Sequence, residues 1–188
     1  PKLARLMINL AGVTTDKILL DPFCGSGTLL IEAIDLGFKN VIGTDIAVRA
    51  IADSTKNIDW YNQTNKTTFK PKLMAADVHT LLQKIQPKSV DAIVTEPFLG
   101  QPLRGFETKE QLVQAARALR LLYEAAFGVF AQILKPGGTV GFIIPEFYAK
   151  NEAITVDCLS HITGLGLKIT PLDSNNDSLL YRRPNQYV

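Results

Sequence analysis

The feature that most constrains the fold is an apolar run that ends on a carboxylate and turns through two glycines into a second apolar run. The stretch reads ILLDPFCGSGTLLIEA and covers residues 18–33. A short, wholly apolar run is typical of a central parallel strand that is covered on both faces. Glycines in the next turn let the backbone approach a ligand, and the start of the following helix offers unpaired N–H groups. We therefore predict a strand, a ligand-binding turn and a helix, in this order.

Strand-like and helix-like patterns alternate along nearly the whole chain. The predicted strands cover residues 17–21, 40–45, 71–77, 89–97, 137–145, 167–173 and 178–184, the last two paired as a hairpin. The predicted helices cover residues 1–12, 28–36, 47–61, 78–85, 108–134 and 152–163. Thr108 and Gln111 stand in capping-box positions at the start of the longest helix. This alternation predicts a doubly wound, Rossmann-like α/β sheet that is parallel except for a C-terminal antiparallel hairpin strand.

Composition limits what such a chain can be. It has 188 residues, 46% of them hydrophobic, which is enough for one globular domain with a sizeable core. The formal net charge of +2 neither indicates nor excludes a nucleic acid partner. The two cysteines share no metal-type or disulfide spacing, and no apolar run reaches ~18 residues. We expect a single domain over residues 1–188, a cytoplasmic location and no metal.

Four of the predicted strands end on acidic residues. Asp21, Asp45 and Asp77 close the first three strands, and Glu96 stands at the end of the fourth. Doubly wound sheets bind ligands outside the carboxyl ends of their strands, where these side chains would form one rim. There Asp45 could accept both hydroxyls of a ribose, and Asp77 could accept from an adenine amine. Each residue alone also has a structural explanation, because Asp commonly starts turns and caps helices.

A nicotinamide-binding fold is the nearest alternative for this pattern. Asp45 lies about 20 positions beyond the glycines, as the acidic residue of that fold does. However, GSGTLL lacks the third glycine of G-x-G-x-x-G, which that fold uses for close packing of helix and strand. Asp21 before the glycines and the EPF turn after the fourth strand also have no role in hydride transfer. The motif therefore fits a nicotinamide site poorly.

The same residues resemble a known family of enzymes. LLDPFCGSGTLLIEA resembles the first motif of class I S-adenosylmethionine-dependent methyltransferases, in the form found in enzymes that methylate exocyclic nitrogens of nucleic acid bases. The opening PKLARLMINLAG, the strand ends at Asp45 and Asp77, and DAIVTEPFLG follow in the order of the tRNA guanine N-methyltransferases that carry a THUMP domain. The resemblance spans essentially the whole chain and implies the class I methyltransferase fold.

The resemblance implies a set of site residues around S-adenosyl-L-methionine. The turn after the first strand would hold the methionine part of the cofactor, the second strand end its ribose, and the third its adenine. The implied cofactor-binding residues are Asp21, Pro22, Phe23, Cys24, Gly25, Gly27, Thr28, Asp45, Ile46, Asp77, Val78 and Glu96. The implied substrate-binding residues are Leu99, Gly100 and Arg104.

The EPF turn carries the implied catalytic residues Glu96, Pro97 and Phe98. An exocyclic amine is a poor nucleophile because its lone pair is delocalised into the ring. A carboxylate and a backbone carbonyl that accept its two N–H groups would direct the lone pair towards a methyl group and stabilise the positive charge that develops. Phe98 is available to stack on an extruded base. The family motif usually reads D-P-P-Y or N-P-P-Y/F, so Glu96, Phe98 and Leu99 depart from it.

The resemblance also implies the partner. A guanine in tRNA is the expected substrate, reached through an N-terminal RNA-binding domain, so we expect the chain to be the C-terminal catalytic part of a longer protein. A DNA amino-methyltransferase and a non-catalytic cofactor-binding relative are the alternatives. Candidate phosphate contacts are Lys2, Arg5, Arg104, Lys109, Arg117, Arg120, Arg182 and Arg183. Arg104 is preferred because the glycines and proline around it predict a loop over the active site.

Overall fold

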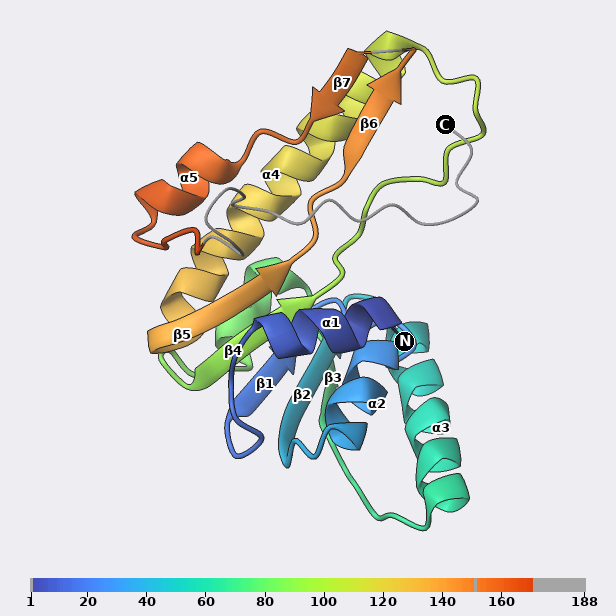
Figure 1. The fold of residues 1–188 in the computed structure, drawn as a ribbon, viewed down its shortest axis with the longest axis vertical. Coiled ribbons are helices and arrows are strands. Elements are labelled where there is room, and N and C mark those ends of the chain that lie inside the picture. Colours follow the sequence, from blue (N-terminus) through green and yellow to red (C-terminus); the bar gives the residue numbers. More distant parts are fainter. Residues whose placement is uncertain (1, 151, 171–188) are drawn as a thin grey trace. The chain divides into compact units, whose positions relative to one another are not determined.

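Figure 1 shows the chain as a computed structural model, which describes residues 2–150 and 152–170. The chain forms two compact units. The first comprises Pro1–Phe98 and Gln132–Ile143, and the second Leu99–Ala131 and Ile144–Val188. We describe each unit by itself, and the single catalytic domain stays a prediction.

The first unit is built on a parallel sheet of five strands in the order β3-β2-β1-β4-β5. The strands are β1 (Ile18–Asp21), β2 (Asn40–Asp45), β3 (Lys72–Ala75), β4 (Val90–Thr95) and β5 (Leu134–Phe142). The chain first moves outwards from β1 to β3 and then crosses back to β4. The order therefore reverses between β1 and β4, and this pair marks the topological switch point. The predicted doubly wound parallel sheet is confirmed.

Helices cover this sheet because its central strands are apolar on both faces. The helices are α1 (Lys2–Leu10), α2 (Thr28–Asp35), α3 (Val48–Asn65) and the 3₁₀ helix η1 (Val78–Gln83). Right-handed crossovers place α2 and α3 on the same face, where α1 contacts α2 (Figure 1). Leu19 and Leu20 point to opposite faces of β1, and both are fully buried. The core under α1 and α2 includes Met7, Ile8, Leu19, Leu30, Ala33, Val41, Ile58 and Val94.

The second unit contains most of α4 (Lys109–Ile133), the strands β6 (Glu146–Ala149) and β7 (Glu152–Thr155), and α5 (Leu159–Gly164). The predicted capping box at the start of α4 is confirmed. The Thr108 amide donates to Gln111 Oε1 at 2.8 Å, and the Gln111 amide donates to Thr108 Oγ1 at 3.3 Å. The apolar face of α4 follows helical spacing and buries Leu112, Ala116, Leu119 and Tyr123.

Two predictions about the C-terminal third are changed by the structure. The helix predicted over residues 152–163 is wrong in its first half, because β7 pairs antiparallel with β6 and α5 begins only at Leu159. Ile154 and Val156 are buried while Thr155 between them is exposed, which is the period of a strand. Residues 167–170 form no strand, and the rest of the predicted closing hairpin lies outside the described residues. Within residues 2–150 and 152–170, no helix is both long and apolar enough to cross a membrane.

Candidate functional site

The carboxylate of Asp21 lies buried at the end of β1, with only 2% of the residue exposed. Its Oδ1 accepts the hydroxyl of Thr95 at 2.6 Å and the amide of Phe23 at 3.1 Å. Burial, aided by the nearby carboxylates of Asp45 and Glu96, raises the pKa of Asp21 to about 7, although the hydrogen bonds from Thr95 and Phe23 act to lower it. The group is therefore poised to exchange a proton near neutral pH, or to ionise fully when a cation lies beside it.

The turn after Asp21, which covers residues 22–27 and is called the glycine turn below, is closed by backbone hydrogen bonds. The Cys24 amide donates to the carbonyl of Thr44 at 2.9 Å, and the Gly27 amide donates to the carbonyl of Cys24 at 2.8 Å. Gly25 has φ +51° and Gly27 has φ +86°, a conformation that side chains disfavour. A Cβ at Gly25 would meet no atom within 4 Å, so the turn has open space on that side. Burial raises the pKa of the Cys24 thiol to about 12, which keeps it protonated and unreactive at neutral pH.

Asp45, at the end of β2, is tied to this turn. Its Oδ2 accepts the Gly25 amide at 3.0 Å, and its Oδ1 accepts the Ala47 amide at 2.9 Å, just before α3 begins. The adjacent Ile46 is 69% exposed. The carboxylate is half-buried and adjoins both the glycine turn and an exposed apolar surface.

Asp77 follows β3 and caps η1. Its Oδ1 accepts the His79 amide at 2.9 Å and lies 2.7 Å from Nδ1 of the same residue. These hydrogen bonds hold the pKa of Asp77 below its usual value, so the side chain is a carboxylate at neutral pH. Asp77 thus has the helix-capping role that is common for Asp at such positions. Its side-chain hydrogen bonds to described residues all use Oδ1. Val78 beside it is buried.

The turn after β4 carries the predicted catalytic residues. Glu96 is half-buried, Pro97 is buried, and Phe98 is 50% exposed. Thr95 immediately before them is the residue that binds Asp21 across the switch point. The structure therefore places Asp21, Asp45, Asp77 and Glu96 after neighbouring parallel strands at one edge of the sheet, as predicted. Of the remaining predicted residues on the first turn, Pro22 is buried, Phe23 is half-buried and Thr28 is exposed.

The predicted substrate residues fall in the second unit. Leu99 is half-buried, and Gly100 has φ +97° with Leu119 and Phe147 close to it. Arg104 is exposed, and its amide donates to Glu107 Oε1 at 2.5 Å. This bond, together with the amide of Gly105, lowers the pKa of the Glu107 carboxyl and shapes the loop. The predicted roles of these residues in substrate binding stay predictions.

Comparison with known proteins decides the family. The family model described as the RMKL-like methyltransferase domain matches residues 1–156 of the chain. The chain belongs to this family. The methyltransferase resemblance inferred from the glycine turn and the strand ends is thereby confirmed.

Relatives of this methyltransferase domain have stated functions. A tRNA (guanine(10)-N2)-dimethyltransferase of Methanocaldococcus jannaschii is 45% identical over 53% of this chain and 28% of its own length. A protein of the same name from Pyrococcus abyssi is 29% identical over 80% of this chain and 45% of its own length. The chain thus spans less than half of either relative. Among solved structures, TrmN from Thermus thermophilus is similar, with a TM-score of 0.55 and 26% identity over 73% of this chain and 36% of that chain.

Sequence reasoning missed the residues that support the site of the methyltransferase domain. Thr95 and Thr44 are fully buried at strand ends, and Ser54 and Asn57 on α3 donate to the glycine turn. Thr44 Oγ1 donates to the carbonyl of Pro22 at 3.3 Å. A polar residue directly before the terminal carboxylate of an apolar strand was the available signal for Thr95 and Thr44. The distant side chains of α3 gave no comparable signal.

Several candidate phosphate contacts of the methyltransferase domain are engaged elsewhere. Arg5 pairs with Glu32 and Asp35 and so joins α1 to α2. Lys109 pairs with Glu152 at 2.7 Å, and Arg120 with Glu124 at 2.7 Å. Arg182 and Arg183 lie outside the described residues.

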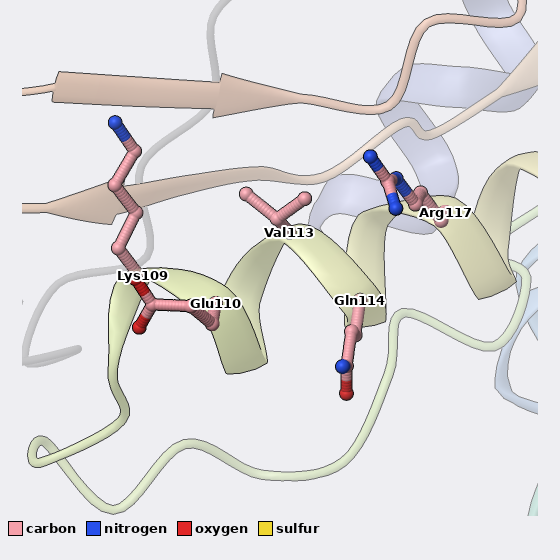
Figure 2. Close-up of a pocket in the computed structure, with 5 residues that line it drawn as sticks. All are labelled: Lys109, Glu110, Val113, Gln114 and Arg117. Carbon is pink, nitrogen blue, oxygen red and sulfur yellow. The ribbon is translucent and has the colours of Figure 1, made fainter.

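Arg117 lines a shallow pocket of about 290 Å³ in the second unit, together with Lys109, Glu110, Val113 and Gln114. Figure 2 shows Lys109, Val113 and Arg117 on one side of α4 and Gln114 on the other. The pocket carries both signs of charge, and Lys109 is already paired with Glu152. This charge pattern does not favour an anion such as phosphate.

Proposed function

We propose that the chain is the catalytic domain of an S-adenosylmethionine-dependent N-methyltransferase that acts on the exocyclic amine of a guanine in tRNA. Membership of a methyltransferase family supports the reaction class. The names of the archaeal relatives, tRNA (guanine(10)-N2)-dimethyltransferase, support guanine N2 and tRNA. A solved methyltransferase structure with S-adenosyl-L-homocysteine bound shares the fold and supports the cofactor.

The observation that carries the proposal is the set of acidic strand ends at the switch point. S-adenosylmethionine carries an ammonium and two ribose hydroxyls, which donate hydrogen bonds to carboxylates, and a sulfonium, whose positive charge carboxylates attract. Asp21 directly precedes the glycine turn and accepts the Phe23 amide, and Asp45 adjoins both that turn and the exposed Ile46. The open space beside Gly25 leaves room for a ligand to approach the backbone. The residues present therefore fit the cofactor.

Each part of the edge has a role in this proposal. Residues 21–28 hold the methionine part, Asp45 accepts the ribose hydroxyls, and Asp77 with Val78 contacts the adenine. Ionised Asp21 lies beside the positive charges of the cofactor, which favour its carboxylate over its neutral form. Because Thr95 holds Asp21 and directly precedes Glu96, the same hydrogen bond links the cofactor turn to the catalytic turn.

The proposed chemistry uses the turn after β4. When bound, S-adenosylmethionine would supply a methyl group on its sulfonium, and the S–CH3 bond would break to release the neutral thioether S-adenosylhomocysteine. Glu96 and the carbonyl of Pro97 accept the two N–H groups of the target amine, which directs its lone pair towards that methyl. Phe98 stacks on the base. As the N–C bond forms, positive charge develops on nitrogen next to the Glu96 carboxylate, which stabilises it and is placed to accept the proton that the amine then loses.

The direct experiment measures transfer of a labelled methyl group from S-adenosylmethionine to tRNA, rRNA or DNA by the full-length protein. We expect label in tRNA, and nucleoside digestion should find it on guanine N2. Label in DNA alone would support the DNA amino-methyltransferase alternative. Cofactor binding without transfer to any of the three nucleic acids would instead support a non-catalytic relative and contradict the proposal.

A further inference from the structure

Two side chains of α3, one helical turn apart, bind the carbonyls of the glycine turn. Ser54 Oγ donates to the Gly25 carbonyl at 2.7 Å, and Asn57 Nδ2 donates to the Ser26 carbonyl at 2.9 Å. Ser54 is fully buried, whereas Asn57 is exposed. A buried hydroxyl inside a helix usually bonds to a carbonyl of its own helix, so a bond to a distant turn marks a specific contact.

The backbone of Gly25 is held from both sides by the segment that runs from β2 into α3. Asp45 accepts its N–H at 3.0 Å, and Ser54 donates to its C=O. Gly25 has φ +51°, and glycine adopts positive and negative φ about equally, so the residue itself hardly favours the observed conformation. The hydrogen bonds of Gly25 with Asp45 and Ser54 therefore stabilise the observed conformation of the turn.

The contact between α3 and the turn leaves no spare room. A Cβ placed on Gly27 would lie 3.0 Å from Ser54 Oγ and 3.2 Å from its Cβ. Ser54 is thus small enough to let the turn approach α3 and still carries a donor. A residue with a larger side chain would push the turn away, and Ala would leave the Gly25 carbonyl with only the weak Cys24 thiol donor at 4.0 Å.

The hydrogen bond from Ser54 to the Gly25 carbonyl also determines the direction of the next N–H group, that of Ser26. A trans peptide holds its C=O and N–H antiparallel. Because Ser54 binds the Gly25 carbonyl, the N–H of Ser26 points away from α3, and it donates to no other described residue. The first amides of α2 follow directly and have no partner within their own helix.

We propose that Ser54 and Asn57 are positioning residues that fix the glycine turn for the methionine part of the cofactor. This inference rests on the proposed function. α3 begins next to Asp45, which is assigned to the ribose, and two turns further on it supports the turn assigned to methionine. One helix therefore sets the spacing between two halves of a single ligand.

The test compares Ser54→Ala and Asn57→Ala with Thr55→Ala as a matched control. Thr55 lies on the exposed face of α3, where its hydroxyl donates to the carbonyl of Ile51. Calorimetry should show that Ser54→Ala weakens S-adenosylhomocysteine about threefold to tenfold, the usual scale for one hydrogen bond. Asn57→Ala should cost about twofold because water replaces its exposed donor, and Thr55→Ala should change nothing. Asn57→Ala is expected to fold normally, so it carries the test if Ser54→Ala does not.

Adenosine separates positioning from a general structural effect, because it lacks the methionine part. Ser54→Ala should leave adenosine affinity within twofold of wild type. Equal losses for adenosine and S-adenosylhomocysteine, or no loss for either, would overturn the inference.

Amide hydrogen exchange in the free protein tests the contact even if the proposed function fails. Wild-type protein that binds neither S-adenosylmethionine nor its product would refute the proposed function. Ser54→Ala should still speed exchange severalfold at Gly25 and Gly27, whose amides are hydrogen-bonded, and Thr55→Ala should not. Unchanged exchange at both amides in Ser54→Ala would refute the contact itself.

Discussion

Thr95 and Asp21 join the two strands at which the sheet reverses its order. Thr95 Oγ1 donates to Asp21 Oδ1 at 2.6 Å, with 0% of Thr95 and 2% of Asp21 exposed. A hydrogen bond to a buried carboxylate is among the stronger ones in proteins. Because the next residue is Glu96, this bond sets the position of the proposed catalytic turn relative to the proposed cofactor turn.

The raised pKa of Asp21 predicts an unusual dependence of stability on pH. The folded state holds this proton up to about pH 7, whereas the unfolded chain releases it near pH 4. Between these values the folded state binds more protons, so the free energy of unfolding falls as pH rises, by about 1.4 kcal/mol per pH unit. Asp21→Asn should remove about 2 kcal/mol of this fall between pH 5 and pH 7, because the folded state is already half deprotonated at pH 7. Urea unfolding at several pH values measures it, with the exposed Asp59→Asn as control. The same slope in Asp21→Asn and wild type would refute the assignment.

Thr95→Val should raise the pKa of Asp21 further, because it removes a donor that favours the carboxylate. It should also lower the free energy of unfolding at pH 8 by about 1.5–3 kcal/mol. Thr44→Val is the matched control, since Thr44 is equally buried at a strand end but donates to the carbonyl of Pro22. Carbon-13 NMR of the Asp21 carboxyl reports the titration. A midpoint that moves equally in both variants would contradict a specific Thr95–Asp21 bond.

The two glycines of the turn should differ in their tolerance of Ala. Both have positive φ, which costs Ala about 1–2 kcal/mol. A Cβ at Gly25 meets nothing within 4 Å, whereas a Cβ at Gly27 meets Ser54 at 3.0 Å. Gly27→Ala should therefore destabilise the protein more than Gly25→Ala, as measured by chemical unfolding. In a double-mutant cycle, Gly27→Ala should cost less in a Ser54→Gly background than in wild type, whereas the cost of Gly25→Ala should not fall. Equal losses for the two glycines would show that the contact with α3 is not tight.

The sequence allowed the sheet and its acidic edge to be predicted because both depend on local patterns. The apolar runs before Asp21 and Asp45 identify buried strands, and parallel strands bring their carboxyl ends to one edge. The resemblance to the methyltransferase family followed from the glycine turn together with the order of the other motifs along the chain. These inferences required no knowledge of which strands pair, since any doubly wound order gathers the same residues at that edge.

The residues that hold the site together were not predictable in the same way. The bond of Ser54 to Gly25 joins positions 29 residues apart, and the bond of Thr95 to Asp21 joins positions 74 residues apart. Neither follows from local spacing, because both depend on how the elements pack. The hairpin of β6 and β7 was missed because a helical pattern across residues 152–163 concealed the short alternation at Ile154 and Val156. Lys150, just before β7, has φ +56°, a conformation that a sequence without glycine there does not suggest.

Asp45→Ala should weaken cofactor binding through two losses, the ribose acceptor and the acceptor of the Gly25 amide. We expect a cost of roughly 1.5–3 kcal/mol in calorimetry with S-adenosylmethionine, the scale for hydrogen bonds to a charged group. Asp53→Ala is the control, because Asp53 lies on the same segment but pairs with Arg49 and Lys56 at the surface. Unchanged affinity in Asp45→Ala, or tighter binding of NADH than of S-adenosylmethionine, would contradict the cofactor assignment.

Glu96→Asp tests whether the catalytic turn is adapted to its longer side chain. Asp is the residue that the resembled enzymes use, but it is one methylene shorter than Glu. If the turn after β4 positions the longer carboxylate, Glu96→Asp should methylate tRNA more slowly than wild type while cofactor affinity stays the same. A faster variant would show that the wild-type turn is not adapted for catalysis.

The most direct test of the account is single-turnover methyl transfer to tRNA by full-length wild type and Glu96→Gln. Gln keeps an acceptor oxygen but loses the charge that stabilises the developing positive nitrogen. We predict that the methylation rate at guanine N2 falls by ~10²–10³, the usual loss for one preorganised electrostatic contact. The affinity for S-adenosylmethionine should stay within about twofold of wild type, because it depends mainly on the residues around Asp21 and Asp45. Equal rates in wild type and Glu96→Gln would contradict the account.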